Sequence, residues 1–478
     1  MTTNFYGFIY RKLIANPDRE LLIWPDQSTH TDNAYTGRAI LNRIATIGNE
    51  LSERRIQPGQ QVLLAMPVTF DLICTLLAIM ALGAIPVLPP ATSSPRTLLL
   101  LAIKEDVRAV VSQQRISPPF RWLAKWFGIS LVDTETVTGS ASAWRLPQTV
   151  DSEQPALISH SSGSTGKAKS IRRSHRVLLA QHQALGEAFP PWPGQRDFPL
   201  FPNILLHNLA SGTVSILPDL PGFDVTRMQP DRIIKQLIGH RVQTLTGNVY
   251  YFRKLLRQLE TQPITFPTVR AVGIGGSPVD ELLAHSLKRF FVQADVYIIY
   301  GSSEAEPIAI RKIGPDRWPA HLGYGVGMIH PSIRVNIRPF GTLAFATGTS
   351  IVVGEIEVKG AHVATPKDDW LPTGDFGYLD EENGLFLTGR MGNERIHQGV
   401  QHYQVEHVLL SVAGVERVAA RSTEAGFTVY IECNPAETDL RNALADHFPP
   451  GIVDRIHFRN ELPVDARHHS KIRYEQVK

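Results

Sequence analysis

A loop rich in serine, threonine and glycine at residues 159–169 contains the first residue types that could do chemistry. It reads Ser-His-Ser-Ser-Gly-Ser-Thr-Gly-Lys-Ala-Lys, follows an apolar run at 155–158 and precedes a helical pattern that begins near Val177. Glycines let a backbone bend closely around an anion, and N–H groups, hydroxyls and lysines can then donate to phosphate oxygens. The loop therefore indicates polyphosphate binding, and the alternative is a polar surface turn.

The spacing within this loop excludes one common phosphate-binding motif. The P-loop of NTPases requires G-x-x-x-x-G-K-[ST]. Counting back from Gly166, Ser161 stands where the first glycine is required, and Ala168 stands where the magnesium-binding hydroxyl is required. The loop also lacks a G-x-G-x-x-G dinucleotide motif, and the glycine run at 323–327 is more typical of a turn.

Two further polar segments directly follow apolar stretches that we predict to be strands. A Gly-Gly-Ser-Pro segment at 275–278 follows the stretch at 270–274, and a Gly-Ser-Ser-Glu segment at 301–304 follows the stretch at 295–300. Ligand-binding loops of a parallel sheet lie at the carboxyl ends of its strands. Both segments are therefore predicted to contribute to a binding site.

The surrounding pattern predicts an α/β fold that positions these loops. Amphipathic spacing at 40–51 predicts a helix, 62–66 a strand, 69–82 a buried helix and 84–88 a buried strand. This alternation indicates a largely parallel sheet. Further predicted elements include a helix at 98–103, a strand at 109–111, helices at 177–189 and 250–259, and strands at 214–217, 270–274 and 295–300.

The predicted secondary structure changes in the last third of the chain. Short β-like segments begin near residue 325 and predict a small, mainly antiparallel β subdomain, and a helix at 405–412 with strands at 415–419 and 428–432 predicts a small α+β domain. We therefore expect a large N-terminal domain at 1–390, made of parallel-sheet α/β subdomains and the β subdomain, and a small C-terminal domain at 391–478.

Composition narrows the classes of function. The chain has 478 residues, 43% hydrophobic and 19% charged, with a formal net charge of +3. It lacks the concentrated basic footprint of a nucleic-acid-binding protein. Its start does not resemble a signal peptide, and its two cysteines, Cys74 and Cys433, form no disulfide framework, so a cytoplasmic location is expected. The uncharged run at 72–90 is interrupted by Gly83 and three prolines, which favours a buried helix and strand over a membrane span.

Taken together, the motifs resemble those of the adenylate-forming (AMP-binding) superfamily, which includes acyl-CoA synthetases, luciferases and peptide-synthetase adenylation domains. Six motifs occur in the order typical of that superfamily: Ser161-Ser162-Gly163-Ser164-Thr165-Gly166-x-x-Lys169, Gly275-Gly276-Ser277-Pro278, Tyr300-Gly301-Ser302-Ser303-Glu304, Thr373-Gly374-Asp375, Gly389-Arg390, and the segment from Pro463 to Lys471.

The resemblance implies a role for each matched residue. The serine-rich loop would hold the β- and γ-phosphates of ATP through Ser161, Ser162, Ser164, Thr165 and Lys169, with Gly163 and Gly166 shaping it, whereas Lys167 sits where the family varies. Gly275, Gly276 and Ser277 would contact adenine, and Tyr300, followed by Gly301, would stack on it. Glu304 would bind Mg²⁺ and Ser303 would contact the α-phosphate. Asp375 would accept the ribose hydroxyls, assisted by Arg390, and Lys471 would stabilise charge at the α-phosphate.

Departures from the family pattern occur at Ala168 and Ser170, where most members have Pro and Gly, and in the C-terminal domain, which the resemblance implies is a mobile lid. Gly392 stands where the family usually has an Asp or Lys hinge, and Ser470 precedes Lys471 where the family usually has Gly. The segment from Pro463 to Ile472, the Phe-Pro-Leu-Phe-Pro stretch at 198–202 and the stretch from Arg390 to Glu406 resemble the β-lactone synthetases of bacterial olefin biosynthesis. In those enzymes a β-hydroxyl attacks its own activated carbonyl, and CoA is not needed.

The sequence therefore supports one main hypothesis and one alternative. The main hypothesis is an ATP- and Mg²⁺-dependent ligase that adenylates a small-molecule apolar carboxylic acid, with ring closure or transfer to CoA or an acyl-carrier-protein thiol as the second step. The alternative is a nucleotide-binding or carrier-docking protein of the same fold that has lost catalysis. His207 could assist a nucleophile, but a structural histidine is the favoured interpretation.

Overall fold

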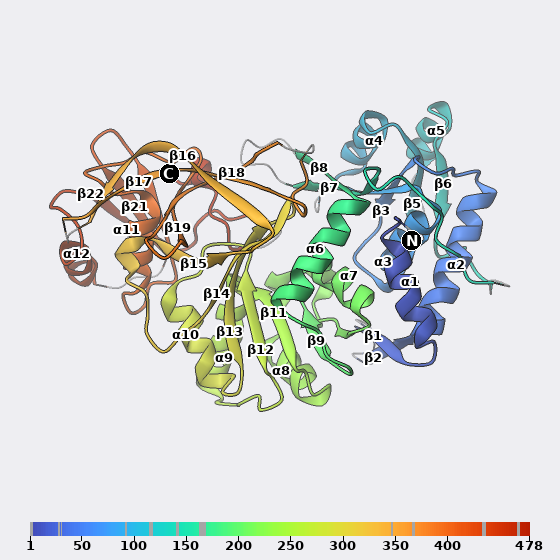
Figure 1. The fold of residues 1–478 in the computed structure, drawn as a ribbon, viewed down its shortest axis with the longest axis horizontal. Helices are drawn as coiled ribbons and strands as arrows, with labels where there is room; N and C mark the ends of the chain where they lie inside the picture. The colour runs from blue at the N-terminus through green and yellow to red at the C-terminus, as the bar shows by residue number, and fades with distance from the viewer. Residues whose placement is uncertain are drawn as a thin grey trace. The chain divides into compact units, whose positions relative to one another are not determined.

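The computed structural model describes the chain except for residues 1–2, 27–28, 30, 91–92, 114–117, 140–142, 162–168, 346–347, 366–368, 433–435 and 466–468, and the side chains of residues 119 and 161. It divides into two compact units, residues 1–243 and 244–478, which we describe separately (Figure 1). The predicted boundary near residue 390 is a different division of the chain and stays a prediction.

A six-stranded sheet organises much of the first unit. Its strand order is β6 (Ser130–Asp133), β5 (Val107–Ser112), β3 (Gln61–Ala65), β4 (Ile85–Leu88), β7 (Pro155–Ser161) and β8 (Lys169–Ser174). The first five strands are parallel, and β8 pairs antiparallel with β7. The predicted strands at 62–66, 84–88 and 109–111 and the predicted parallel sheet are confirmed.

Alternating side chains of the central strand β3 pack into two different cores. Val62 and Leu64 pack with α2 (Gly37–Glu53) and α3 (Phe70–Ala81). Leu63 packs on the opposite face with α4 (Pro95–Lys104) and α5 (Pro118–Trp126). This alternation follows from the two-residue period of a strand that is covered by helices on both faces.

Helix α3 is the buried helix predicted at 69–82. Every residue from Leu72 to Ala81 is buried, and the Thr69 hydroxyl caps the helix by accepting from the Leu72 N–H at 3.3 Å. No helix among the described residues is both long and apolar enough to cross a membrane.

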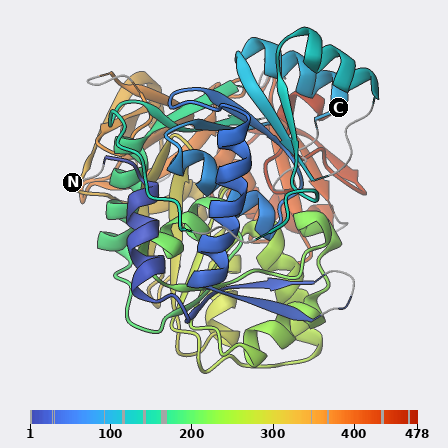
Figure 2. The same ribbon diagram turned by 90° about the vertical axis from the view of Figure 1, so that its right-hand side faces the viewer.

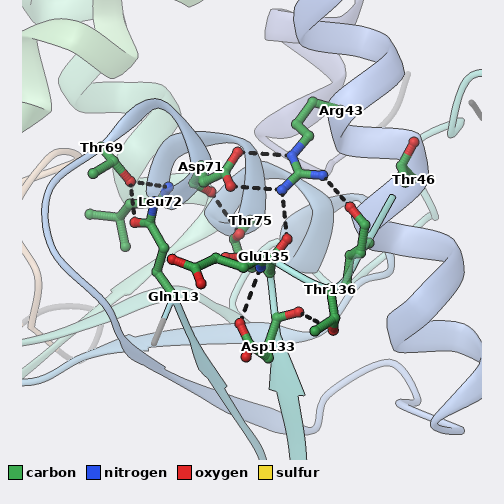
Figure 3. A network of polar contacts seen from close by, with 12 residues as sticks. Arg43, Thr46, Thr69, Asp71, Leu72, Thr75, Gln113, Asp133, Glu135 and Thr136 are labelled. Carbon is green, nitrogen blue, oxygen red and sulfur yellow. Dashed lines mark hydrogen bonds and ion pairs between the residues drawn. The ribbon is translucent and has the colours of Figure 1, made fainter. Parts of the chain in front are cut away.

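Arg43 ties helix α2 to helix α3 and to the segment after β6 (Figure 3). Its Nε donates to Asp71 Oδ1 at 2.8 Å, and its Nη2 donates to Asp71 Oδ2 at 2.7 Å. The same guanidinium donates to the carbonyl oxygens of Thr134 at 3.0 Å and Val137 at 2.7 Å. One planar cation thus satisfies a carboxylate and two backbone acceptors.

The rest of the first unit contains α1 (Tyr6–Ala15), α6 (His175–Ala188), α7 (Pro202–Ser211) and α8 (Pro230–Gly239). A second group of strands pairs in the order β9 (Arg196–Pro199), β10 (Val214–Ile216), β1 (Glu20–Pro25) and β2 (Asp32–Thr36). The predicted helix at 177–189 corresponds to α6, and the predicted strand at 214–217 corresponds to β10.

The second unit begins with three parallel strands, β11 (Thr244–Asn248), β12 (Ala271–Gly275) and β13 (Asp295–Ser302), and helices α9 (Val249–Thr261) and α10 (Glu281–Phe290). The sheet continues with antiparallel strands, in the spatial order β14 (Ala305–Lys312), β15 (Tyr324–Ile329), β19 (Gly384–Arg390), β18 (Leu371–Leu379), β17 (Ser350–Gly360) and β16 (Ile333–Ala344). The predicted change to antiparallel structure is confirmed.

Two details of the second unit differ from or refine the predictions. The glycine run at 323–327 was predicted as a turn, but residues 324–327 form the start of strand β15. Position 325 requires a glycine because a Cβ there would lie 2.2 Å from the Trp318 ring. The final segment contains α11 (His402–Leu410), α12 (Glu437–Ala445) and a three-stranded sheet of β20 (Arg417–Ser422), β21 (Phe427–Glu432) and β22 (Val453–Arg459). The predicted α+β character of this segment is confirmed.

Candidate active site

Three predicted site residues meet in the second unit. Tyr300 Oη donates to Asp375 Oδ2 at 2.9 Å, and Arg390 Nη1 donates to Asp375 Oδ1 at 2.6 Å. The side chains of Asp375 and Arg390 are 15% and 38% exposed, so a ligand can reach them. The three residues come from three strands, β13, β18 and β19, and their contact brings residues 75 positions apart in the sequence together.

The antiparallel hairpin of β18 and β19 explains why the acid and the base meet. Asp375 lies directly opposite Arg390 in the register, where cross-strand side chains are neighbours. Gly374 has φ of 74°, a left-handed conformation that favours glycine. The Thr373 hydroxyl accepts from the Asp375 N–H at 3.1 Å and donates to the Ile356 carbonyl at 2.9 Å. These contacts fix the direction of the Asp375 carboxylate.

The electrostatics of this cluster keep its two donors, Tyr300 and Arg390, protonated. The Asp375 carboxylate raises the pKa of Arg390 above its usual value. Burial, and then the nearby Asp375 charge, raises the pKa of Tyr300 well above its usual value, so its hydroxyl stays a donor at neutral pH. A half-buried carboxylate that is oriented by two donors has remaining lone pairs for a ligand that offers hydroxyl groups.

The turn after β12 provides a close backbone surface next to this cluster of strands. Strands β12 and β13 are parallel neighbours, and Gly275 pairs with Ile299, so the turns that follow them start at the same edge. A Cβ at Gly275 would lie 2.4 Å from the Ile299 carbonyl oxygen, and Gly276 has φ of 84°. The Ser277 Oγ is buried and has no hydrogen-bond partner among the described residues. An unpaired polar atom of this kind is a candidate ligand contact.

Gly301 lies at the end of β13, and Ser303 and Glu304 form the turn to β14. A Cβ at Gly301 would lie 2.9 Å from the Ala305 carbonyl oxygen, which explains the glycine. The Glu304 carbonyl accepts from the Ala364 N–H at 2.7 Å, and its N–H donates to the Ser302 hydroxyl at 3.3 Å. Among the described residues no group of three or more acidic, His or Cys side chains could hold a metal, so a metal here would need ligands from the substrate as well.

The predicted phosphate loop connects strands β7 and β8 of the first unit. Ser161 ends β7, Lys169 begins β8, and the two residues pair directly across the hairpin. Ser162, Gly163, Ser164, Thr165, Gly166 and Lys167 lie outside the described residues, so their predicted role is not tested.

Lys471 lies near the end of the chain in a short hairpin-like segment. Its N–H donates to Asp465 Oδ1 at 3.0 Å, its carbonyl oxygen accepts from the Asp465 N–H at 2.9 Å, and Val464 bridges to Ile472. These contacts position the backbone of an exposed lysine. Its predicted catalytic role stays a prediction, as does the hinge role of Gly392, whose φ of 89° favours glycine.

Comparison with known proteins decides the family. Residues 11–366 match the model of the AMP-binding enzyme family. The chain belongs to the AMP-binding enzymes. Within this family it is an adenylate-forming ligase, and the α/β fold and the resemblance inferred from the motifs are both confirmed.

Individual relatives of this AMP-binding enzyme differ in their named activities. The olefin beta-lactone synthetase of Stenotrophomonas maltophilia (strain K279a) is 27% identical over 398 residues, which cover 74% of this chain and 71% of the relative. A long-chain-fatty-acid–CoA ligase of Salmonella typhimurium is 27% identical over 357 residues, which cover 66% of this chain and 60% of that ligase. The chain therefore aligns with less than two thirds of the length of the fatty-acid ligase.

Solved structures show the same fold. The O-succinylbenzoate coenzyme A synthetase of Bacillus subtilis in complex with AMP has a TM-score of 0.79 at 17% identity, and the similarity covers 99% of this chain and 98% of that one. ATP-bound MatB of Rhodopseudomonas palustris has a TM-score of 0.78 at 18% identity, with 99% and 98% coverage.

The structure adds residues around Arg390 that the motif comparison missed. The Arg390 N–H donates to His402 Nε2 at 2.9 Å, and His402 Nδ1 lies 3.2 Å from Glu406 Oε1. The Tyr474 hydroxyl in turn lies 2.8 Å and 2.9 Å from the two Glu406 oxygens. The i, i+4 spacing of His402 and Glu406 was the available signal, but the helix predicted at 405–412 begins after His402, whereas α11 begins at His402.

His207 behaves as a structural histidine in the AMP-binding enzyme. Its Nδ1 lies 3.0 Å from His182 Nδ1, and its Nε2 lies 3.4 Å from the Ser211 hydroxyl. Burial lowers the pKa of His207 to about 3, so the ring is neutral at physiological pH. These contacts occupy both ring nitrogens, which agrees with the interpretation favoured from the sequence.

Proposed function

We propose that this enzyme uses ATP and Mg²⁺ to convert a fatty or β-hydroxy fatty acid into an acyl adenylate and pyrophosphate. The observation that carries the proposal is the Asp375 carboxylate, oriented by Tyr300 and Arg390 and still 15% exposed. A carboxylate with free lone pairs suits the two adjacent hydroxyls of a ribose. The membership in the AMP-binding family supports the same ligand.

The remaining adenosine contacts would come from the two turns at the neighbouring strand ends. The Tyr300 ring would stack on adenine, and the unpaired Ser277 hydroxyl would gain a partner from the nucleotide. Glycine at 275 and 301 lets neighbouring backbone pack closely behind these turns, and the left-handed Gly276 lets the chain turn sharply beside the ligand. These features fit a nucleotide because they combine an aromatic ring for the base, a backbone turn beside it and a carboxylate that can accept from the ribose hydroxyls.

The phosphates and the metal would be held by the serine-rich loop, by Ser303 and Glu304, and by Lys471. Ser161, Ser162, Ser164, Thr165 and Lys169 would donate to the β- and γ-phosphates. Glu304 would supply one carboxylate to Mg²⁺, which usually binds one or two carboxylates together with substrate phosphates. Ser303 would contact the α-phosphate, and the Lys471 ammonium would stabilise the negative charge that builds there during attack by the acid.

The apolar substrate is supported by the first unit and by the relatives. A small pocket in that unit is lined only by apolar side chains, including those of Trp24, Ile73, Phe201, Leu205 and Phe223. The pocket is too small to hold an alkyl chain, but its lining is typical of an apolar environment. The names of the relatives include both a β-lactone synthetase and fatty-acid ligases.

For the second step we propose β-lactone closure, with transfer to CoA or a carrier-protein thiol as the competing outcome. In ring closure the β-hydroxyl oxygen would form a bond to the acyl carbon, the acyl–phosphate bond would break, AMP would leave and the hydroxyl proton would pass to water. The reacting groups belong to one molecule, so proximity offsets part of the ring strain. The resemblance of the segment at 463–472 to β-lactone synthetases favours this route.

An ATP–[³²P]pyrophosphate exchange assay over fatty and β-hydroxy fatty acids tests the first step. We expect acid-dependent exchange that Lys471→Ala abolishes, whereas Lys478→Ala, seven residues further on, leaves exchange unchanged. ATP binding without acid-dependent exchange would instead support a protein that has lost catalysis. Mass spectrometry of the products, with and without CoA, tests the second step. A lactone formed without CoA is expected, and a thioester would contradict this proposal.

A further inference from the structure

Helix α5 presents tryptophan and basic residues outward. Trp122 and Trp126 are 65% and 75% exposed, and their rings contact each other at a centroid distance of 5.9 Å. Arg121 and Lys125 precede them and are also exposed. The inward positions are small or buried, as shown by Ala124 at 0% exposure. Phe120 and Ala124 face the core, as on an ordinary amphipathic helix, and the two tryptophans are nevertheless left on the solvent face.

Helix α4 repeats this pattern on the same side of the sheet. Leu100 and Ile103 are 58% and 42% exposed, and Arg96 and Lys104 stand four residues before and after Leu100. Buried residues of α4 and α5 belong to one core cluster against the six-stranded sheet. The two helices lie side by side in both ribbon views (Figures 1 and 2).

Together these residues form what we call the α4–α5 face, made up of Leu100, Ile103, Trp122, Trp126 and Phe127 with Arg96, Lys104, Arg121 and Lys125. Neither helix contains an acidic residue. Apolar side chains exposed on two neighbouring helices are typical of an interaction site.

The charges of this face identify its partner. Tryptophan and arginine are common in protein–protein interfaces, whereas lysine is depleted there. Here Lys125 directly precedes Trp126, and Lys104 ends α4. Tryptophan and basic residues together are typical of surfaces that lie on a bilayer, where the indole sits at headgroup level and the cations attract anionic lipid. The four cations and the lack of acidic residues complement an anionic membrane surface.

We propose that the α4–α5 face docks this enzyme reversibly on bilayers that contain anionic lipid. The indoles of Trp122 and Trp126 enter the headgroup region while Arg121, Lys125, Arg96 and Lys104 contact the lipid charges. Docking is peripheral and therefore weakens as salt screens the charges. It is a property of the surface and does not require the adenylation reaction.

Vesicle flotation of the full chain tests the proposal. Vesicles of phosphatidylcholine alone are compared with vesicles of phosphatidylcholine mixed with phosphatidylglycerol. We expect the protein to float with the anionic vesicles and to dissociate at high salt. The double variant Arg121→Glu with Lys125→Glu should bind at least about 25-fold more weakly, since each surface cation contributes roughly fivefold.

The tryptophans are tested by Trp122→Ser with Trp126→Ser. Anionic vesicles should shift the tryptophan emission of the unmodified protein to shorter wavelength, and this double variant should lose most of the shift. Matched controls on other exposed sites are Phe340→Ser with Val352→Ser for apolar loss and Lys235→Glu with Arg289→Glu for charge. All four variants should fold, because the changed side chains are exposed, and circular dichroism checks this.

Three results would overturn the proposal. The first is absence of flotation with anionic vesicles, and the second is flotation of the two α5 variants as strong as that of the controls. The third is a dimer that the tryptophan variant disperses while no vesicle binding occurs, since the face would then join two copies of the chain. Pyrophosphate exchange measured on the same variants separates this proposal from the proposed function, because exchange should be retained.

Discussion

Replacement of His407 on helix α11 should release that helix from its position in the second unit. The ring is 2% exposed. Its Nε2 accepts from the Glu281 N–H at 3.3 Å, and its Nδ1 donates to the Gly323 carbonyl oxygen at 2.9 Å. The ring also stacks on Tyr324 at a centroid distance of 4.5 Å. Only the neutral ring with its proton on Nδ1 satisfies both backbone groups.

The size of the effect follows from those two hydrogen bonds. Leucine at position 407 would leave the Glu281 N–H and the Gly323 carbonyl buried without partners, at a cost of about 2 kcal/mol each. His407→Leu should therefore lower the free energy of local opening by about 4 kcal/mol, which is roughly a thousandfold in the opening equilibrium. In His407→Gln the side-chain oxygen can still accept from the Glu281 N–H, so the cost should be about half.

Acid should weaken the same contact in the unmodified protein. Burial lowers the pKa of His407, and the positive charge of Arg311 lowers it further. The negative charges of Asp280 and Glu281 raise it, but burial has the larger effect. Because the folded pKa lies below the unfolded one, the stabilisation is complete above about pH 6.5 and is lost as the pH falls below that value. Protonation would point a second N–H at the Glu281 N–H and break that bond.

Hydrogen–deuterium exchange of peptides that cover residues 402–410 measures these effects. Protection should fall in the order unmodified protein, His407→Gln, His407→Leu, and the acid-induced loss should be smaller in His407→Gln than in the unmodified protein. His457→Leu on β22 is the matched control and should leave α11 protected. Unchanged protection in His407→Leu, or full acid sensitivity in His407→Gln, would refute the reasoning.

Three further predictions concern other polar contacts. Tyr300→Phe keeps the ring but removes the donor to Asp375, so calorimetry should show ATP binding about tenfold weaker, and Asp375→Asn should weaken it further. Burial lowers the pKa of His175 to about 4, so its contribution to stability is lost between about pH 6.5 and pH 4, and at pH 5 the loss should be about 2 kcal/mol; denaturation midpoints should show less acid sensitivity in His175→Asn. Arg43→Gln breaks a partly buried pair and should cost about 3 kcal/mol in urea unfolding, whereas Arg38→Gln, from an exposed pair, should cost less than about 1 kcal/mol.

The elements that could be predicted from the sequence are those whose apolar residues face inward. Helix α3 and strand β4 follow from an uncharged run broken by Gly83, because both elements are almost fully buried. Residues 114–150 gave no predicted order, and they contain α5 and β6. The reason is physical, since α5 carries apolar side chains on both faces: Phe120 and Ala124 are buried, whereas Trp122 and Trp126 face solvent. The apolar pattern of this short helix therefore does not separate its two faces.

The candidate site could also be predicted from the sequence only in part. Motifs identified Asp375 and Arg390 separately, but only the register of β18 and β19 places them opposite each other. Nothing local in the sequence indicates that Tyr300, 75 positions away, donates to the same carboxylate. Residue types at motif positions could therefore be assigned in advance, whereas the contacts between strands depend on tertiary pairing.

Arg390 connects Asp375, the proposed ribose-binding residue, to the C-terminal segment of the chain. Its side chain holds Asp375, and its backbone N–H is held by His402. His402 contacts Glu406, which also accepts from the Tyr474 hydroxyl, three residues after Lys471. Each contact in this series is a hydrogen bond with a charged or backbone partner, so displacement of one member leaves its neighbour unpaired. The series therefore gives a physical reason for the position of helix α11 to depend on the state of Asp375. It also shows that the C-terminal segment contacts Arg390 through polar side chains and not through an apolar surface alone.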